Sequence, residues 1–464
     1  MLHPVRAIRT PGLGVLLTLV LLPALSGPVR QAAAADGSLV IAALHVLEQE
    51  YVDAVNPVQL LNGAIAALRD AANLSADELP EIPQGTSETA AQDAFITAFA
   101  HAVQTRAMSE SQFAYAATRG MLMSLHDSST SFLDPAQWDE MRGQLAGAPQ
   151  STGIGVTIIS RKDSEGVPRI FIGDAPPGSP ARDAGLRRFD NILEVDGKPL
   201  TNISVSNAAQ LLQGRAGSTA NLLIQRAGQT LRVPVVRAPI RASANVIDVL
   251  RPGVVYVRIF EFSRGTGQGL RSGLEREDAD QLVRSIILDL RGNRGGLVAE
   301  VASVGGIFLP NGTVLAMVRE KGGQLRVVRA SGTPLWADRP LVVLVDADSA
   351  SASEMLAAAF KENQRAFLVG DKTAGVLGGT EALALPEGAL EVTFERIFSP
   401  FGAQIDGVGI TPDVTVALTA ADMERGEDTQ LQAALHIVGV AGRLRVPRCP
   451  DPEVVGGMRP CASP

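Results

Sequence analysis

The stretch Leu341–Phe360, LVVLVDADSASASEMLAAAF, decides how the central part of the chain folds. Five apolar residues precede the polar run Asp346–Ser353, and an Ala-rich amphipathic segment follows. This order predicts a buried strand, a sharp turn and a helix. Such a turn brings a small polar side chain to a sheet edge beside a helix N-terminus, where unpaired N–H groups and the positive end of the helix dipole lie. The hydroxyl of Ser351 is therefore a candidate nucleophile.

The same turn also has a purely structural interpretation. The sequence Ser351-Ala-Ser-Glu354 fits a capping box, in which Ser351 is the N-cap and Glu354 reaches back to it. Taken alone, the pattern favours a cap over catalysis. The surrounding sequence has to decide between the two.

Strands and helices alternate on both sides of this stretch, which predicts a layered α/β core. Two glycine-rich turns, Arg291–Gly296 and Asp371–Gly375, flank the serine turn in the chain. Because glycine lets backbone N–H groups approach a substrate closely, the amide of Gly295 or Gly296 could join that of Ala352 in an oxyanion hole. The other predicted elements of the core, residues 241–420, are the strands Gly253–Ile259, Ile286–Leu290, Val314–Arg319 and Phe367–Gly370 and the helices Gly269–Leu282 and Val298–Phe308.

A serine nucleophile needs a base, and the composition of the core limits the choice. The chain has five His residues and none lies between residues 241 and 420, which excludes a Ser-His-Asp triad built within the core. A desolvated lysine is the other standard base. Of the three core lysines, Lys321, Lys361 and Lys372, Lys361 lies about 15 Å along the predicted helix from the serine, which is too far. Lys372, in a glycine-bounded turn, is the local candidate.

The segments before the core predict two further domains. Residues 36–150 carry apolar residues at helical spacing, which predicts a helical leader. The leader ends in the polar turn Leu125–Pro135, where we expect the proline to stop the helix. Residues 151–240 predict a β-rich module that begins with the glycine-rich segment Gly153–Val156.

The first 35 residues have the layout of a secretory signal peptide. Arg6 and Arg9 precede the apolar run Gly12–Leu25, and Ala32–Ala35 supplies an A-x-A cleavage site. The apolar run is about 14 residues long, short of the ~20 that a transmembrane helix needs. We therefore expect an exported protein without a stable membrane span, and an uncleaved N-terminal anchor is the alternative.

Composition limits the remaining classes of function. A chain of 464 residues is too long for one core, so two to four domains are expected. The net charge of −8, from 41 basic and 49 acidic residues, argues against a nucleic-acid partner. The two cysteines, Cys449 and Cys461, support neither a disulfide framework nor a Cys/His metal cluster, and they either pair with each other or stay free. Residues 421–464 predict a closing helix, Thr429–Val440, and a Pro-rich disordered tail.

The β-rich module carries four motifs in the order G-I-G-V, P-G-S-P-A, A-G-L and D-N-I-L-E-V-D-G. This order closely resembles a PDZ domain of the bacterial type. The resemblance implies that the glycine-rich loop presents N–H groups to a peptide's terminal carboxylate, and that the next strand accepts the peptide as an added strand. The partners would be C-terminal tails of polypeptides; the alternative is a module that only buttresses the core. The residues of the loop are Gly153, Ile154, Gly155 and Val156.

Four more motifs follow the module: D-L-R-G-N-R-G-G, S-A-S-A-S-E, G-D-K-T-A-G and G-V-G-I-T-P-D. Together they resemble the carboxyl-terminal processing peptidases of peptidase family S41, also called tail-specific proteases, over about residues 39–440 apart from an apparent insertion near residues 70–110. The resemblance implies a multidomain α+β protein with a helical leader, a PDZ domain and a ClpP/crotonase-like α/β core. It also implies that Ser351 is the nucleophile and a lysine its base, with no metal or cofactor.

One residue departs from the family pattern. The family's base lysine directly follows the glycine that ends the G-D-K-T-A-G motif, but here Gly375 is followed by Val376, which cannot take a proton. The family's assisting glutamine is also unmatched, since Thr380 and Glu381 lie near its position.

Two hypotheses follow from this departure. In the first, the chain is an exported serine endopeptidase that cuts polypeptides near their C-termini and uses a displaced base; Lys372 is our candidate, and Glu381 or His126 are the other options. In the second, the chain is a scaffold that holds peptide tails without cutting them. The sequence leaves the oligomeric state and the physiological substrate open.

Overall fold

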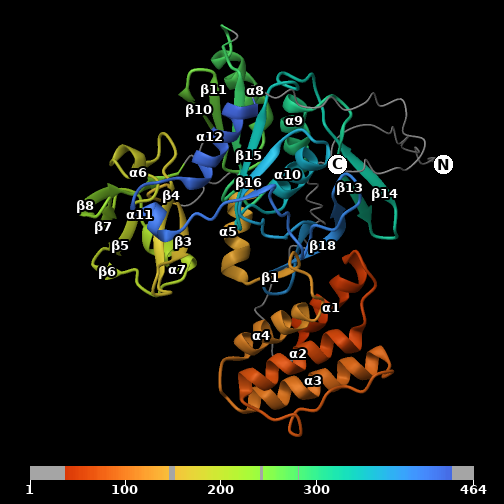
Figure 1. Ribbon diagram of the computed structural model, residues 1–464. Helices are drawn as coiled ribbons and strands as arrows, with labels where there is room; N and C mark the ends of the chain where they lie inside the picture. Colours follow the sequence, from red (N-terminus) through yellow and green to blue (C-terminus); the bar gives the residue numbers. More distant parts are fainter. Residues whose placement is uncertain (1–36, 146–151, 241–243, 281, 442–464) are drawn as a thin grey trace, which may run out of the picture.

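The computed structural model describes residues 37–145, 152–240, 244–280 and 282–441. Figure 1 shows three bodies: a bundle of helices, a β-rich module and a larger α/β core. The predicted signal peptide and both cysteines lie outside the described residues. Within those residues, no helix combines the length and the apolar character needed to cross a bilayer.

The helical leader is a bundle of four helices whose apolar faces meet in one core. Its helices are α1 (Ser38–Glu50), α2 (Pro57–Ala72), α3 (Glu88–Gln104) and α4 (Glu110–Met123). Asn56 is the N-cap of α2. Ser109 is the N-cap of α4 and forms a capping box with Gln112. The apolar core of the bundle also contains Leu390 and Val392 from strand β18 (Ala389–Phe398) of the α/β core. The leader is therefore packed onto the core rather than joined to it only by the chain.

The polar turn at the end of the leader differs from the prediction. Strand β1 (Ser131–Leu133) lies in it and pairs antiparallel with β18. Pro135 is then the first residue of helix α5 (Pro135–Leu145). The prediction that this proline stops a helix was wrong, because a proline in the first turn of a helix lacks only an N–H that has no partner there.

The β-rich module is an antiparallel sheet with two helices. Its sheet has the order β3 (Thr157–Lys162), β4 (Pro168–Asp174), β5 (Asn191–Val195), β7 (Thr219–Arg226) and β8 (Gln229–Val236), with β6 (Lys198–Pro199) beside β5; its helices are α6 (Pro180–Asp183) and α7 (Val205–Leu212). A separate two-stranded pairing of β2 (Thr152–Gly153) with β9 (Ala238–Pro239) closes the module next to the core. Strand β3 lies at the edge of the sheet, so one of its sides is open to a further strand.

The α/β core is built on a six-stranded sheet with helices on both faces (Figure 1). Its strands, in order across the sheet, are β10 (Asn245–Arg251), β11 (Val254–Ile259), β12 (Ser285–Asp289), β15 (Leu341–Val345), β16 (Phe367–Gly370) and β19 (Val414–Thr415); its helices are α8 (Thr266–Glu277), α9 (Val298–Phe308), α10 (Ala352–Glu362) and α12 (Thr429–Ala441). All strand pairs from β11 to β19 are parallel, and β10 is antiparallel to β11. In β15, Val343 and Val345 pack with α8, α9 and α10, whereas Val342 and Leu344 pack with α12. This two-sided burial explains the unbroken apolar run that predicts the strand.

A second sheet joins the core to the leader. It has the order β1, β18, β13 (Val314–Glu320) and β14 (Leu325–Arg329), and β17 (Gly378–Ala384) also pairs with β18. On the other side of the molecule, Phe171 and Phe189 of the β-rich module pack with Met423 of α11 (Ala420–Glu424). The core therefore contacts both other bodies through apolar side chains.

A buried group of ion pairs lies where the β-rich module meets the core. Arg258 on β11 pairs with Asp174 of the module at 3.1 Å and with Asp289 at the end of β12 at 3.2 Å. Arg291 pairs with Asp289 at 2.6 Å and with Asp428 at 2.8 Å. Burial disfavours the charge on Asp289, but Arg291 and Arg258 outweigh it and hold the pKa of its carboxyl well below its usual range.

Candidate active site

Three turns that are far apart in the chain converge at one edge of the main sheet. Strands β12, β15 and β16 are parallel neighbours, so their carboxyl ends lie together. The glycine-rich turn after β12, the serine turn after β15 and the second glycine-rich turn after β16 all begin there. The carboxyl edge of a parallel sheet is where open α/β folds bind their ligands.

Ser351 lies directly before the first residue of α10 in a strained conformation. Its φ is 55° and its ψ is −120°, a backbone geometry that non-glycine residues rarely adopt and that occurs at functional sites. The residue is half-buried, and its N–H donates a 2.7 Å hydrogen bond to the carbonyl of Val376. Since Ala352 begins the helix, its amide is one of the N–H groups that have no partner within the helix.

Gly295 lies against the serine so closely that only glycine fits. Its φ is 105°, and a Cβ added to it would lie 2.7 Å from Ser351 Cβ, 2.9 Å from Ala352 N and 3.0 Å from Ser351 Oγ. The N–H of Gly295 already donates to Asn293 Oδ1 at 2.8 Å. The N–H of Gly296 has no acceptor among the residues that the structure describes. The first glycine-rich turn therefore contacts Ser351, and the backbone N–H of its Gly296 is free among the described residues.

Asn293 holds this glycine-rich turn against the serine turn. Its side chain is fully buried and donates to the carbonyl of Ile259 at 2.9 Å. Its own carbonyl accepts from the N–H of Ala350 at 3.0 Å and from Ser353 Oγ at 2.9 Å. The sequence analysis missed this residue, although a polar amide between glycines in a turn is a recognisable signal.

Glu354 holds the second glycine-rich turn against the serine. The buried carboxylate accepts from Thr373 Oγ1 at 2.5 Å, from Gly375 N at 2.7 Å and from Val376 N at 3.0 Å, and also from Ser351 N at 3.2 Å. Burial raises the pKa of the Glu354 carboxyl, and these four donors lower it only in part. Glu354 accepts a hydrogen bond from the N–H of Ser351, as the capping box predicts. The same carboxylate also accepts hydrogen bonds from the turn about twenty residues further along the chain.

The glycine-rich loop of the β-rich module lies beside its edge strand. Gly153 pairs with Ala238, and the buried Ile154 accepts from the N–H of Ala181 at 2.8 Å. The structure gives the amides of Gly155 and Val156 no acceptor within its described ranges. Two unbonded N–H groups at the start of an open strand are the arrangement that a terminal carboxylate requires.

Comparison with known families identifies both the α/β core and the β-rich module. The pattern of peptidase family S41 matches residues 253–416, and that of the PDZ domain matches residues 171–226. The carboxyl-terminal-processing protease of Picosynechococcus is 34% identical over 337 residues, which cover 70% of this chain and 79% of that protein. The chain belongs to peptidase family S41. Its relatives there are the carboxyl-terminal-processing proteases, which are serine peptidases.

Two further comparisons agree with the assignment to family S41. The chloroplastic carboxyl-terminal-processing peptidase 2 of Arabidopsis thaliana is 30% identical over 324 residues, and the match spans 67% of this chain and 62% of that protein. The solved structure of the photosystem II D1 C-terminal processing protease has 25% sequence identity and a TM-score of 0.53, and covers 89% of this chain and all of that one. The predicted S41 and PDZ resemblances and the predicted α+β fold are thus confirmed.

None of the three candidate bases predicted from the sequence makes a hydrogen bond to Ser351 in the described part of the chain. Lys372, Glu381 and His126 are all exposed, and in the part of the chain that the structure describes none of them hydrogen-bonds Ser351 Oγ. Val376 is half-buried and contacts Ser351 through its backbone. The structure thus brings Ser351, Ala352 and the Gly295–Gly296 turn together, and it places position 376, rather than position 372, directly against Ser351.

Proposed function

We propose that the protein is an exported serine endopeptidase that hydrolyses polypeptides near their C-termini after the PDZ domain has bound the tail. The observation that supports it most is the strained, half-buried Ser351 between the Gly295–Gly296 turn and the amide of Ala352, which has no acceptor in the described part of the chain. In this mechanism Ser351 Oγ attacks the peptide carbonyl, and the amides of Ala352 and Gly296 stabilise the oxyanion. The proton from Oγ passes through the base to the leaving amine, and water then hydrolyses the acyl-enzyme.

Lys372 is the base that we propose to test first. It belongs to the turn that Glu354 holds against the serine through Thr373 and Gly375. Because Lys372 is exposed, a bound substrate has to exclude water from it before its amine can act as a base. Replacement of Lys372 by Ala should then reduce turnover and shift the pH–rate profile, whereas Lys361→Ala should change neither.

The experiment that tests the peptidase uses an unstructured protein with an apolar C-terminal tail as the substrate. The Ser351→Ala variant should lose at least about 10³-fold in cleavage rate, because the nucleophile is removed while the binding surfaces stay. Ser353→Ala is not a matched control, since Ser353 Oγ donates a hydrogen bond to the carbonyl of Asn293; the exposed Ser272 serves better. Unchanged cleavage by Ser351→Ala would remove Ser351 from its role.

One observation favours a second candidate function. Val376 occupies the position of the family's base lysine, so the chain could hold peptide tails in the PDZ domain without cutting them. A serine-reactive fluorophosphonate probe separates the two functions. Covalent labelling of Ser351 supports the peptidase, whereas tail binding without labelling supports the scaffold.

Export is proposed from the predicted signal peptide. Expression of the full chain, followed by cell fractionation and N-terminal sequencing, should recover a mature protein that begins at Asp36. Recovery of an intact Met1 in the membrane fraction would favour the uncleaved anchor instead.

A further inference from the structure

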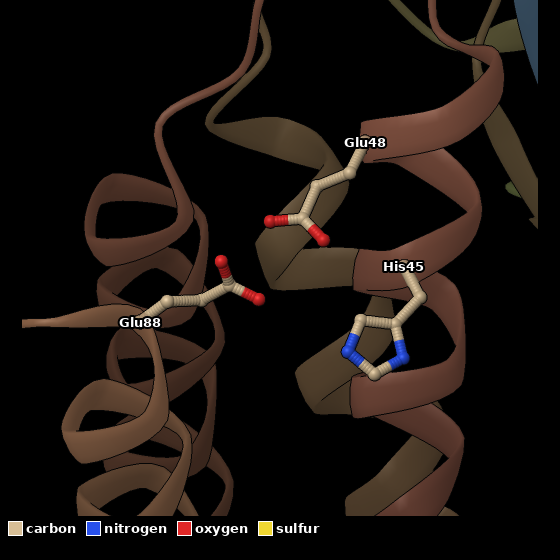
Figure 2. A group of neighbouring side chains, drawn as sticks. All are labelled: His45, Glu48 and Glu88. Atoms are coloured by element: carbon tan, nitrogen blue, oxygen red, sulfur yellow. The ribbon is translucent and has the colours of Figure 1, made fainter.

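A cluster of metal-ligating side chains lies in the helical leader, outside the candidate active site described above. His45 and Glu48 are three residues apart on α1, and Glu88 is the first residue of α3. Their ligand atoms all lie within 4.8 Å of one another. Figure 2 shows the imidazole and the two carboxylates pointing into the same space between the two helices.

A fourth possible ligand comes from the next turn of α3. Gln92 Nε2 lies 3.3 Å from His45 Nε2 and donates to Glu88 Oε1 at 3.1 Å. Gln92 follows Glu88 by four residues, so both side chains lie on one face of α3. Rotation of the amide by half a turn would place its oxygen where its nitrogen now lies. Each helix therefore offers two donors at helical spacing, as in metal sites built between the helices of bundles.

The cluster brings two carboxylates together with one imidazole. Among the residues that the structure describes, neither Glu48 nor Glu88 forms an ion pair with Lys or Arg. Their ligand oxygens lie within 4.8 Å of each other, so two ionised carboxylates repel at this position. A divalent cation between the two carboxylates would remove this repulsion.

We propose that His45, Glu48 and Glu88 bind a divalent transition-metal ion, with Zn²⁺ as the best fit, and that Gln92 or water completes the shell. One imidazole nitrogen with carboxylate oxygens is a donor set that suits zinc, whereas calcium and magnesium favour sites of oxygen alone. Zinc accepts four ligands in a compact tetrahedron, which small side-chain rotations can reach, since His45 and Glu88 are exposed and Glu48 is half-buried.

The ion would have a structural effect that extends to the core. It would cross-link α1 to α3 within the bundle. The C-terminal end of α1 contacts the core directly, because Lys321 Nζ donates to the carbonyls of Glu48 and Gln49. Immediately after α1, Tyr51 accepts a hydrogen bond from Arg396 of β18 at 2.6 Å. Zinc bound at this site is thus expected to stabilise the packing of the leader on the core, not to take part in peptide hydrolysis.

The test measures zinc binding by the complete chain. Protein stripped with a chelator is dialysed against Zn²⁺, and the metal content is then measured by mass spectrometry while the thermal midpoint Tm is measured by calorimetry. We expect about one zinc per chain and a rise in Tm of about 5 °C at saturating zinc. Co²⁺ should compete for the site and give visible absorption bands, and a large excess of Mg²⁺ or Ca²⁺ should not displace the zinc.

Matched variants assign the ion to these residues. His45→Ala and Glu88→Gln should each lose the bound zinc and the rise in Tm. His101→Ala, on the same helix as Glu88, and Glu50→Gln, on the same helix as His45, should keep both. Circular dichroism of the metal-free variants confirms that they are folded. Wild-type protein that retains no zinc, or zinc that survives His45→Ala and Glu88→Gln equally, would overturn the proposal.

Discussion

The N–H of Ser351 donates a 2.7 Å hydrogen bond to the carbonyl of Val376, so the residue after Gly375 lies directly against the predicted nucleophile. A base at position 376 would therefore be in place to take the proton from Ser351, and a valine cannot do so. The scaffold around the serine is complete in other respects, since Asn293 and Glu354 hold both glycine-rich turns in position. Peptide hydrolysis at this site therefore depends on which group accepts the proton from Ser351 Oγ.

Replacement of Val376 by Lys should increase peptide hydrolysis. A positioned general base contributes at least about 10²-fold to rate, and a half-buried position favours a lysine with a lowered pKa. Cleavage of a fluorogenic peptide with an apolar tail measures the effect. Val376→Met is the control, because it adds length without a proton acceptor. A lysine variant no faster than the methionine variant would contradict the assignment of position 376.

Replacement of Gly295 by Ala should abolish the reactivity of Ser351. The new Cβ would lie 2.7 Å from Ser351 Cβ and 2.9 Å from Ala352 N, so Ser351 and the backbone amide of Ala352 have to move. Gly312→Ala is the control: its φ of 85° carries the same backbone strain, but no atom lies within 4 Å of the added methyl. Fluorophosphonate labelling should disappear in Gly295→Ala and persist in Gly312→Ala, and equal labelling of both would refute the argument from contact.

Replacement of Glu354 by Gln should destabilise the serine turn. The carboxylate accepts from four donors, and an amide turns one of its two acceptor atoms into a donor that faces N–H groups. Buried donors without acceptors cost about 1–3 kcal/mol each, so we expect a loss of about 3 kcal/mol in the free energy of unfolding. Urea denaturation measures it, with the exposed Glu424→Gln as the control. A loss no greater than that of the control would show that the four bonds do not hold the turn.

The buried ion pairs around Asp289 predict that acid destabilises the fold. The pKa of Asp289 and of Asp428 is lowered in the folded state, so the unfolded chain binds more protons at low pH. Their contribution to stability is complete above the ordinary carboxyl pKa of about 4 and is lost as the pH falls below it towards the folded values. Unfolding free energies measured in urea between pH 7 and pH 3 should show this decline.

Asp289→Asn separates this contribution from general acid effects. The variant leaves Arg291 and Arg258 without their shared carboxylate, so it should lose about 3–5 kcal/mol at pH 7 and decline less on acidification. The exposed Asp183→Asn should keep both the wild-type stability and the wild-type decline. A decline in Asp289→Asn as steep as that of the wild type would mean that other carboxylates determine the acid sensitivity.

The elements around the serine could be predicted from local sequence, because each depends on a run of residues close in the chain. The strand and helix of Leu341–Phe360 follow from an unbroken apolar run and an amphipathic segment, and both occur where expected. Helix α9 also has the predicted bounds, Val298–Phe308. Such patterns carry no information about partners far away in the sequence.

The errors and omissions arise where distant segments meet. The residues just before Pro135 form a strand because they pair with β18, more than 250 residues later in the chain, and no local pattern reports that pairing. The role of Asn293 depends on contacts with Ile259 and Ala350. The bond from Thr373 to Glu354 likewise joins two turns whose proximity only the folded sheet creates.

Strand β18 supplies Leu390 and Val392 to the interior of the helical bundle while it pairs with β1, β13 and β17. Detachment of the bundle would expose two aliphatic side chains to water and strip a strand from the second sheet. A protease nick between the N-terminal helices and the rest of the chain should therefore leave the two fragments associated, and only a denaturant should separate them.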